Sequence, residues 1–169
     1  MKRLKLTGLC ILFSLLLLLP GMTNGQVLNV QETTQEYDQW CWAASSWVIL
    51  QYYGNDFNQC DIANYTRTHA TFHDFGSVDC CLPSNTSGWK CNYWNYNYDS
   101  AGSIRMILID MPPTISNPSI DNYGEGRSLS ASETQTEISA GRPFVIRIDN
   151  PGHFVVGHGY QNGNIYFMD

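Results

Sequence analysis

The sequence predicts an α+β fold in which an N-terminal helical part packs on a small C-terminal antiparallel sheet. Helix-compatible segments lie before residue 141, and apolar and polar residues alternate with the two-residue period of strands from residue 144 onward. Helices that precede a meander of strands are typical of α+β proteins. The 169 residues suit one compact domain, because domains usually hold about 100–200 residues.

Four helices are expected in the first part of the chain. The first is an apolar run closed by Gly54, a residue type that commonly ends helices, with Asp38 upstream as a candidate N-cap. The fourth is capped by Ser130 or Ser132 and stopped by Gly141. The expected ranges are 41–53, 59–68, 101–110 and, for the fourth helix, up to residue 140.

Three strands are expected after these helices. The segments FVIRI, HFVVGHGY and IYFMD occupy residues 144–148, 153–160 and 165–169. The turn-forming sequences DNPG and QNGN separate them, which favours an antiparallel meander.

The first 25 residues resemble a secretory signal peptide. Basic residues at positions 2, 3 and 5 precede an apolar run over about residues 9–19, and small or polar residues follow. Cleavage after Gly25 leaves a domain of residues 26–169 and implies a secreted or periplasmic protein. A permanent anchor is the alternative, but the run is shorter than the ~20 residues that span a bilayer. We therefore expect no membrane association after removal of the leader.

The charge balance argues against a nucleic-acid partner. The chain has nine Lys and Arg residues against fifteen Asp and Glu residues, a formal net charge of −6. Nucleic-acid-binding domains present a basic stripe or patch, which this composition does not supply.

The cysteines divide into a cluster of four and one that stands apart. In an exported protein, the odd number that survives cleavage suggests disulfides plus one free thiol. Adjacent cysteines rarely pair with each other, so Cys80 and Cys81 should each take one of Cys60 and Cys91, in a connectivity that the sequence leaves open. A zinc site formed by these cysteines with His69 and His73 is the less favoured alternative, and we expect no metal and no cofactor.

Cys41, the cysteine that stands apart, has the features of a nucleophile. It lies at the first turn of an expected helix, where free N–H groups and the helix dipole favour a thiolate. His153 opens an expected strand and can exchange the proton, and Asp169 lies on the next strand, where it can orient the imidazole. His158 is five residues beyond His153, an odd offset that places it on the opposite face of the strand.

These residues resemble the papain-like cysteine peptidases, in particular the compact bacterial secreted or effector branch related to the bacteriocin-processing peptidases. The resemblance rests on WCWAASS, GHFVVGHGY, IYFMD and the turn AGRP at 140–143, and it spans roughly residues 31–169. It implies a papain-like fold with Cys41, His153 and Asp169 as the catalytic triad. It also implies that Gln35, six residues before the nucleophile, helps to form the oxyanion hole. Gln39 also lies close to Cys41 and is an alternative for that role, but we expect it to serve the loop instead. Relatives usually continue beyond the third triad member, whereas this sequence ends at Asp169.

The expected function is therefore that of a secreted, monomeric cysteine peptidase that hydrolyses peptides or proteins. Two alternatives stay open. One is a non-catalytic, disulfide-stapled module that binds a glycan or protein through the aromatic stretch NYWNYNYD at 92–99. The other is an acyltransferase that uses the same triad. Nothing in the sequence encodes the substrate specificity.

Overall fold

The computed structural model describes residues 25–82, 90–97, 100–112, 128–150 and 152–169, and it has the expected α+β architecture. The expected signal peptide at 1–25 lies almost entirely outside the described residues. The helices are α1 (Cys41–Tyr52), α2 (Gln59–His69), α3 (Ile104–Asp110) and α4 (Ala131–Ser139). The strands are β1 (Gln26–Val27), β2 (Phe144–Ile148), β3 (His153–Gln161) and β4 (Asn164–Met168).

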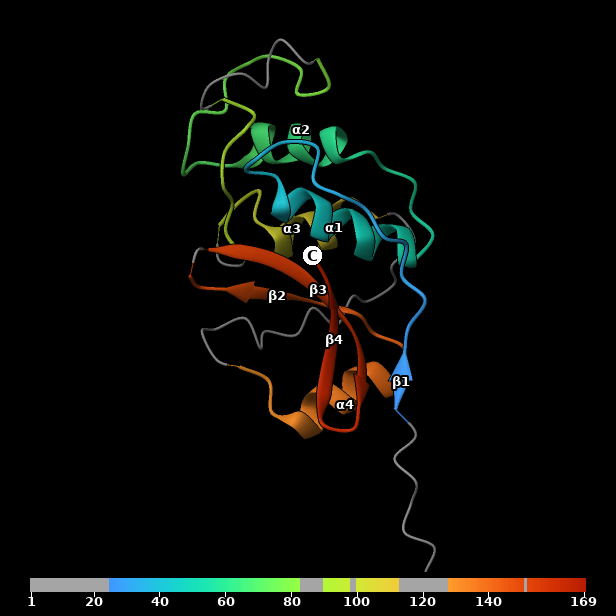
Figure 1. The fold of residues 1–169 in the computed structure, drawn as a ribbon. Coiled ribbons are helices and arrows are strands. Elements are labelled where there is room, and N and C mark those ends of the chain that lie inside the picture. Colours follow the sequence, from blue (N-terminus) through green and yellow to red (C-terminus); the bar gives the residue numbers. More distant parts are fainter. Residues whose placement is uncertain (1–24, 83–89, 98–99, 113–127, 151) are drawn as a thin grey trace, which may run out of the picture.

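Helix α1 is the centre of the fold. It contacts α2 and α3 on one side and strands β2 and β3 on the other, as the upper half of Figure 1 shows. Trp42, Val48 and Leu50 are fully buried, and even Ser46 is inaccessible to solvent, because a helix enclosed from several sides needs a surface that is apolar or internally bonded all round. The Ser46 hydroxyl meets that requirement by donating to the Trp42 carbonyl at 2.8 Å.

Strand β3 is the centre of the sheet. It pairs antiparallel with β2 and β1 along one edge and with β4 along the other. The two-residue strand β1 was not predicted, because two residues are too few to show a period. Helix α4 lies apart from the other three helices, near the lower ends of β3 and β4 in Figure 1.

The helix boundaries follow the expected ones with two corrections. Ser130 caps α4 as expected, and Gly141 ends it with a φ of +72°. The proposed cap at Asp38 is wrong: Trp40 occupies the N-cap position of α1 without a side-chain cap, because residues 38–40 form a turn. The third helix begins at residue 104 rather than 101, since Gly102, with a φ of +75°, cannot continue a helix.

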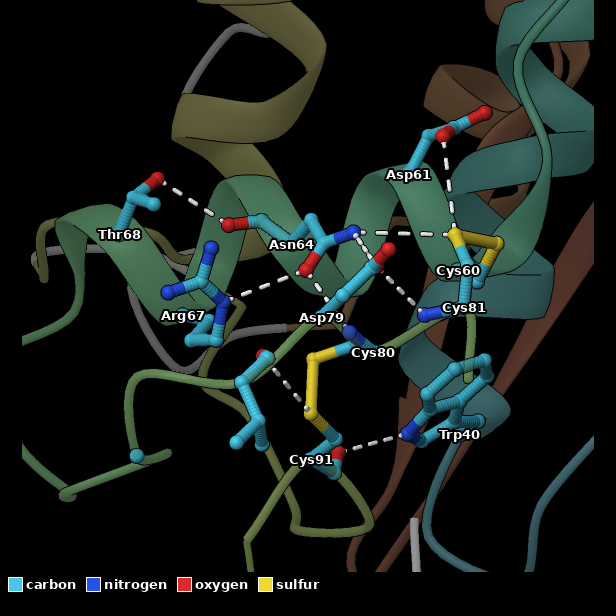
Figure 2. The surroundings of a disulfide bond; sticks show 12 residues. Trp40, Cys60, Asp61, Asn64, Arg67, Thr68, Asp79, Cys80, Cys81 and Cys91 are labelled. Carbon is cyan, nitrogen blue, oxygen red and sulfur yellow. Dashed lines mark hydrogen bonds between the residues drawn. A yellow bond between two sulfur atoms is a disulfide. The ribbon is translucent and has the colours of Figure 1, made fainter. Parts of the chain in front are cut away.

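The disulfides pair Cys60 with Cys81 and Cys80 with Cys91, which confirms that the adjacent cysteines take separate partners (Figure 2). Cys41 is free, also as expected. Because all four clustered sulfurs are bonded in these two pairs, none of them is a free thiolate that could bind zinc, as the zinc alternative required.

Among the described residues no helix is long and apolar enough to cross a membrane.

Candidate active site

The chain reaches Cys41 through an entry segment, residues 33–40, that belongs to no helix or strand. Gln35 organises its last turn: the Nε2 group donates to the carbonyl of Tyr37 at 3.0 Å and to that of Asp38 at 2.9 Å. The Trp40 N–H donates to the same Tyr37 carbonyl at 2.9 Å. The side chain expected in the oxyanion hole thus also shapes the turn that leads to Cys41.

Residues 91–93 fasten both sides of Cys41 to the disulfide region. The buried Trp40 indole donates to the Cys91 carbonyl at 2.8 Å (Figure 2), and the Trp42 indole donates to the Tyr93 carbonyl at 2.8 Å. The Gln39 N–H donates to the Asn92 side chain at 3.0 Å. The Cys80–Cys91 disulfide therefore anchors the segment against which α1 begins. The sequence carried no signal for Asn92, because only the fold brings it to residue 39.

The thiol of Cys41 is half-buried at the interface between α1 and the sheet. Burial raises its pKa above the ordinary value; the backbone N–H groups of Phe154, Trp42 and Cys41 lower it, and the Asp169 carboxylate raises it. The expectation that the helix start favours the thiolate is thus wrong in its net effect. The N–H groups do act in that direction, but desolvation outweighs them.

The same contacts fix where the sulfur lies. A hydrogen bond from the Phe154 backbone places it against the first residues of β3, next to His153, and Asp169 is close enough for its charge to act on the thiol. In Figure 1 the end of the chain, marked C, is drawn next to α1 and β3. The fold therefore brings Cys41, His153 and Asp169 into one region although 128 residues separate the first from the last.

His153 and Asp169 form a direct pair. The imidazole Nε2 lies 2.5 Å from the Asp169 Oδ1, with side-chain exposures of 28% and 64%. An ionised carboxylate only accepts hydrogen bonds, so the proton of the neutral imidazole is held at Nε2. That tautomer leaves Nδ1 as the nitrogen with a free lone pair.

A bulge in the β3–β4 hairpin decides which face Asp169 occupies. The pairing shifts by one residue between the pairs Gly159–Tyr166 and Gly157–Phe167, so that His158 is the extra residue on β3. Toward the end of the hairpin, Val156 is paired with Met168.

Continuing this register sets Asp169 opposite Val155, and residues opposite each other share a face. Because side chains alternate along a strand, Val155 and His153 also share a face. Without the shift, Asp169 would lie opposite Val156 and point away from the imidazole. The bulge is the local feature that makes the His153–Asp169 bond possible.

The other candidate residues lie elsewhere. His158 serves the β1 side of the sheet, where its Nδ1 lies 3.1 Å from the Leu28 carbonyl. His69 stacks on Tyr65 with 4.1 Å between ring centroids, and His73 stacks on Tyr93 at 3.5 Å.

The aromatic stretch that begins at residue 92 packs largely on neighbouring rings. Trp94 stacks on Phe72 with centroids 5.9 Å apart and meets Tyr96 edge-on at 4.9 Å. Trp94 and Tyr96 remain 39% and 37% exposed, so most of each side chain is buried. This arrangement matches a stapled loop more closely than an open binding platform.

Comparison with known protein families decides the relationship. Residues 27–169 match the model of the Peptidase_C39 like family. The chain belongs to this family. The match runs from β1 to Asp169 and so covers Cys41, His153 and Asp169. Searches of curated proteins and of solved structures returned no match.

Membership of the Peptidase_C39-like family confirms the relationship to the papain-like cysteine peptidases and indicates a cysteine-peptidase type of enzyme. Such an enzyme acts on peptides or proteins. The two disulfides are consistent with an extracellular location.

Proposed function

We propose that this Peptidase_C39-like protein hydrolyses peptide bonds with Cys41 as nucleophile, His153 as general base and acid, and Asp169 as the group that orients the imidazole. The observation that carries the proposal is the 2.5 Å bond from His153 Nε2 to Asp169. This bond holds the ring in the tautomer whose Nδ1 can accept a proton. The backbone of Phe154, the residue that follows His153, is hydrogen-bonded to the Cys41 sulfur.

The raised pKa of the Cys41 thiol fits a mechanism in which the thiol loses its proton as the sulfur attacks the substrate carbonyl. His153 Nδ1 takes the thiol proton while the sulfur adds to the scissile carbonyl carbon. Collapse of the tetrahedral intermediate breaks the C–N bond, and the imidazolium gives its proton to the leaving amine. Water then hydrolyses the thioester with His153 again as base, which restores the thiol and releases the acid.

The oxyanion is proposed to bind the Cys41 backbone N–H and the Gln35 amide. Both N–H bonds of that amide are donated to carbonyls of the entry segment in this structure. Gln35 must therefore exchange one of these bonds for the substrate oxygen. Removing an oxyanion donor typically costs ~3 kcal/mol of barrier, so Gln35→Ala should lower kcat about a hundredfold.

The test is a digest of a peptide library by the wild type and Cys41→Ala side by side. Cys41→Ala should abolish cleavage, and His153→Ala should reduce it by at least about a thousandfold. His69→Gln is the matched control, because that histidine is exposed and stacks on Tyr65 of its own helix. Cleavage that survives in Cys41→Ala excludes the proposal. Transfer of the acyl group to an added amine in preference to water would instead identify an acyltransferase.

We further propose that the protein is a secreted or periplasmic monomer whose leader is removed after Gly25. Mass spectrometry of the exported protein should give a chain that begins at Gln26, and light scattering should give the mass of one copy. A retained leader would contradict the first statement, and a dimer mass the second.

A further inference from the structure

The entry segment, residues 33–40, depends on side-chain amides for its hydrogen bonds. Backbone N–H and C=O groups need partners, and a segment outside helices and sheets finds them in side chains, in its own turns or in water. Gln59, Gln35 and Asn92 supply them in succession along the segment. Gln35 and Asn92 hold its later part, as described above.

Gln59, which lies outside the entry segment, forms hydrogen bonds with its earlier residues. It is the first residue of α2 and only 2% exposed. Its Oε1 accepts the Glu36 N–H at 3.1 Å, and its Nε2 donates to the Thr34 carbonyl at 2.8 Å. The same Nε2 lies 3.4 Å from the Thr33 hydroxyl oxygen. One amide group thus forms hydrogen bonds with the backbone of the residues immediately before and immediately after Gln35.

We propose that Gln59 is a positioning residue for the active site, a role that rests on the proposed function. It fixes the peptide groups on both sides of Gln35, and Gln35 in turn fixes the turn that presents Cys41. Gln59 itself is desolvated, and the loss of its amide removes both hydrogen bonds at once, so the Thr34 carbonyl and the Glu36 N–H must find other partners and the segment is free to move. A misplacement of about 1 Å near a reacting group can lower turnover about a hundredfold.

The proposal is tested with Gln59→Met, which keeps the length of the side chain and removes both hydrogen bonds. The matched control is Thr66→Val on the same helix. Thr66 is fully buried and donates to the Gly102 carbonyl at 2.9 Å, so the control also deletes a buried side-chain bond to backbone, but away from the entry segment. If Gln59→Met does not fold, Gln59→Glu replaces it: that change keeps the acceptor for the Glu36 N–H and exchanges the Nε2 donor, which serves the Thr34 carbonyl and lies near the Thr33 hydroxyl, for a carboxyl oxygen.

We expect Gln59→Met to lower kcat at least tenfold with KM within about twofold of the wild-type value. Hydrogen exchange over residues 33–40 should become faster. In a Gln35→Ala background the same change should lower kcat less than twofold further, because the effect passes through Gln35. Thr66→Val should leave kcat and the exchange of residues 33–40 within about twofold of wild type.

Three results would overturn the positioning role: equal losses of kcat in both backgrounds, an equal loss in Thr66→Val, or unchanged exchange over residues 33–40. Failure of the peptidase proposal looks different. It is shown by a wild type that cleaves no peptide or by activity that persists in Cys41→Ala, and the exchange measurement still decides whether Gln59 holds the segment.

Discussion

The two disulfides should contribute unequally to stability, in the order opposite to their loop lengths. Chain entropy alone favours the longer loop: a separation of 21 residues for Cys60–Cys81 gives about 3.3 kcal/mol, and one of 11 residues for Cys80–Cys91 gives about 2.8 kcal/mol. The entropic difference is therefore only about 0.5 kcal/mol.

Burial reverses this order. Cys80 and Cys91 are 1% and 0% exposed and belong to the hydrophobic core, whereas Cys81 is exposed. Deleting two core sulfurs costs roughly 2 kcal/mol, if each is counted as one buried methylene plus the cavity it leaves. We therefore expect Cys80→Ala with Cys91→Ala to cost roughly 5 kcal/mol, against roughly 3 kcal/mol for the other pair of substitutions.

Urea unfolding of the two double variants measures this difference directly, through the midpoint and the m value. The buried pair should also affect turnover, because the Cys91 carbonyl holds the Trp40 indole next to Cys41, the proposed nucleophile. Equal destabilisation, or a larger loss for Cys60 and Cys81, would refute the assignment of Cys80–Cys91 as the core-anchoring bond.

Three further predictions concern single residues. Asp169→Asn should speed the alkylation of Cys41 by iodoacetamide at neutral pH, since the carboxylate raises the thiol pKa, while it slows peptide hydrolysis; a fall in both rates would contradict this electrostatic account. Gly157→Ala should destabilise by about 1–2 kcal/mol in urea unfolding, because a Cβ would lie 2.7 Å from the Phe144 ring, and Phe144→Leu should restore most of the loss. Ser130→Ala should cost about 1 kcal/mol by the same assay, because that hydroxyl caps α4, and an unchanged midpoint would exclude a stabilising cap.

The sequence was most informative where one residue type is tied to one backbone requirement. The glycines that end α1 and α4 have φ values of +79° and +72° at Gly54 and Gly141, conformations that other residues rarely adopt. Likewise, the clustering of four cysteines between residues 60 and 91 correctly separated them from Cys41, which is free.

The thiol environment was less predictable, because it depends on distant segments. The helix start alone favours a thiolate, but the packing of β3 against α1 buries the sulfur and reverses the net shift in its pKa. Asn92 and Gln59, which hold the residues before Cys41, act from 53 and 23 positions away along the chain. No local pattern encodes such contacts, since each depends on how the elements pack.

The position of Asp169 shows how spacing and structure combine. A separation of sixteen residues from His153, with a two-residue turn between the strands, indicates that both lie on neighbouring strands but does not fix their faces. A hairpin with regular pairing would have turned Asp169 away, and the one extra residue at His158 corrects the register. The residues on either side of the bulge are Gly157 and Gly159, and a Cβ added to them would lie 3.0 Å or less from Phe144 and Tyr166. Their lack of a side chain therefore lets Phe144 and Tyr166 pack closely against the strand at the bulge. The GHGY sequence therefore contributes to the candidate site by setting the register of β4, which the Asp169 carboxylate directly follows.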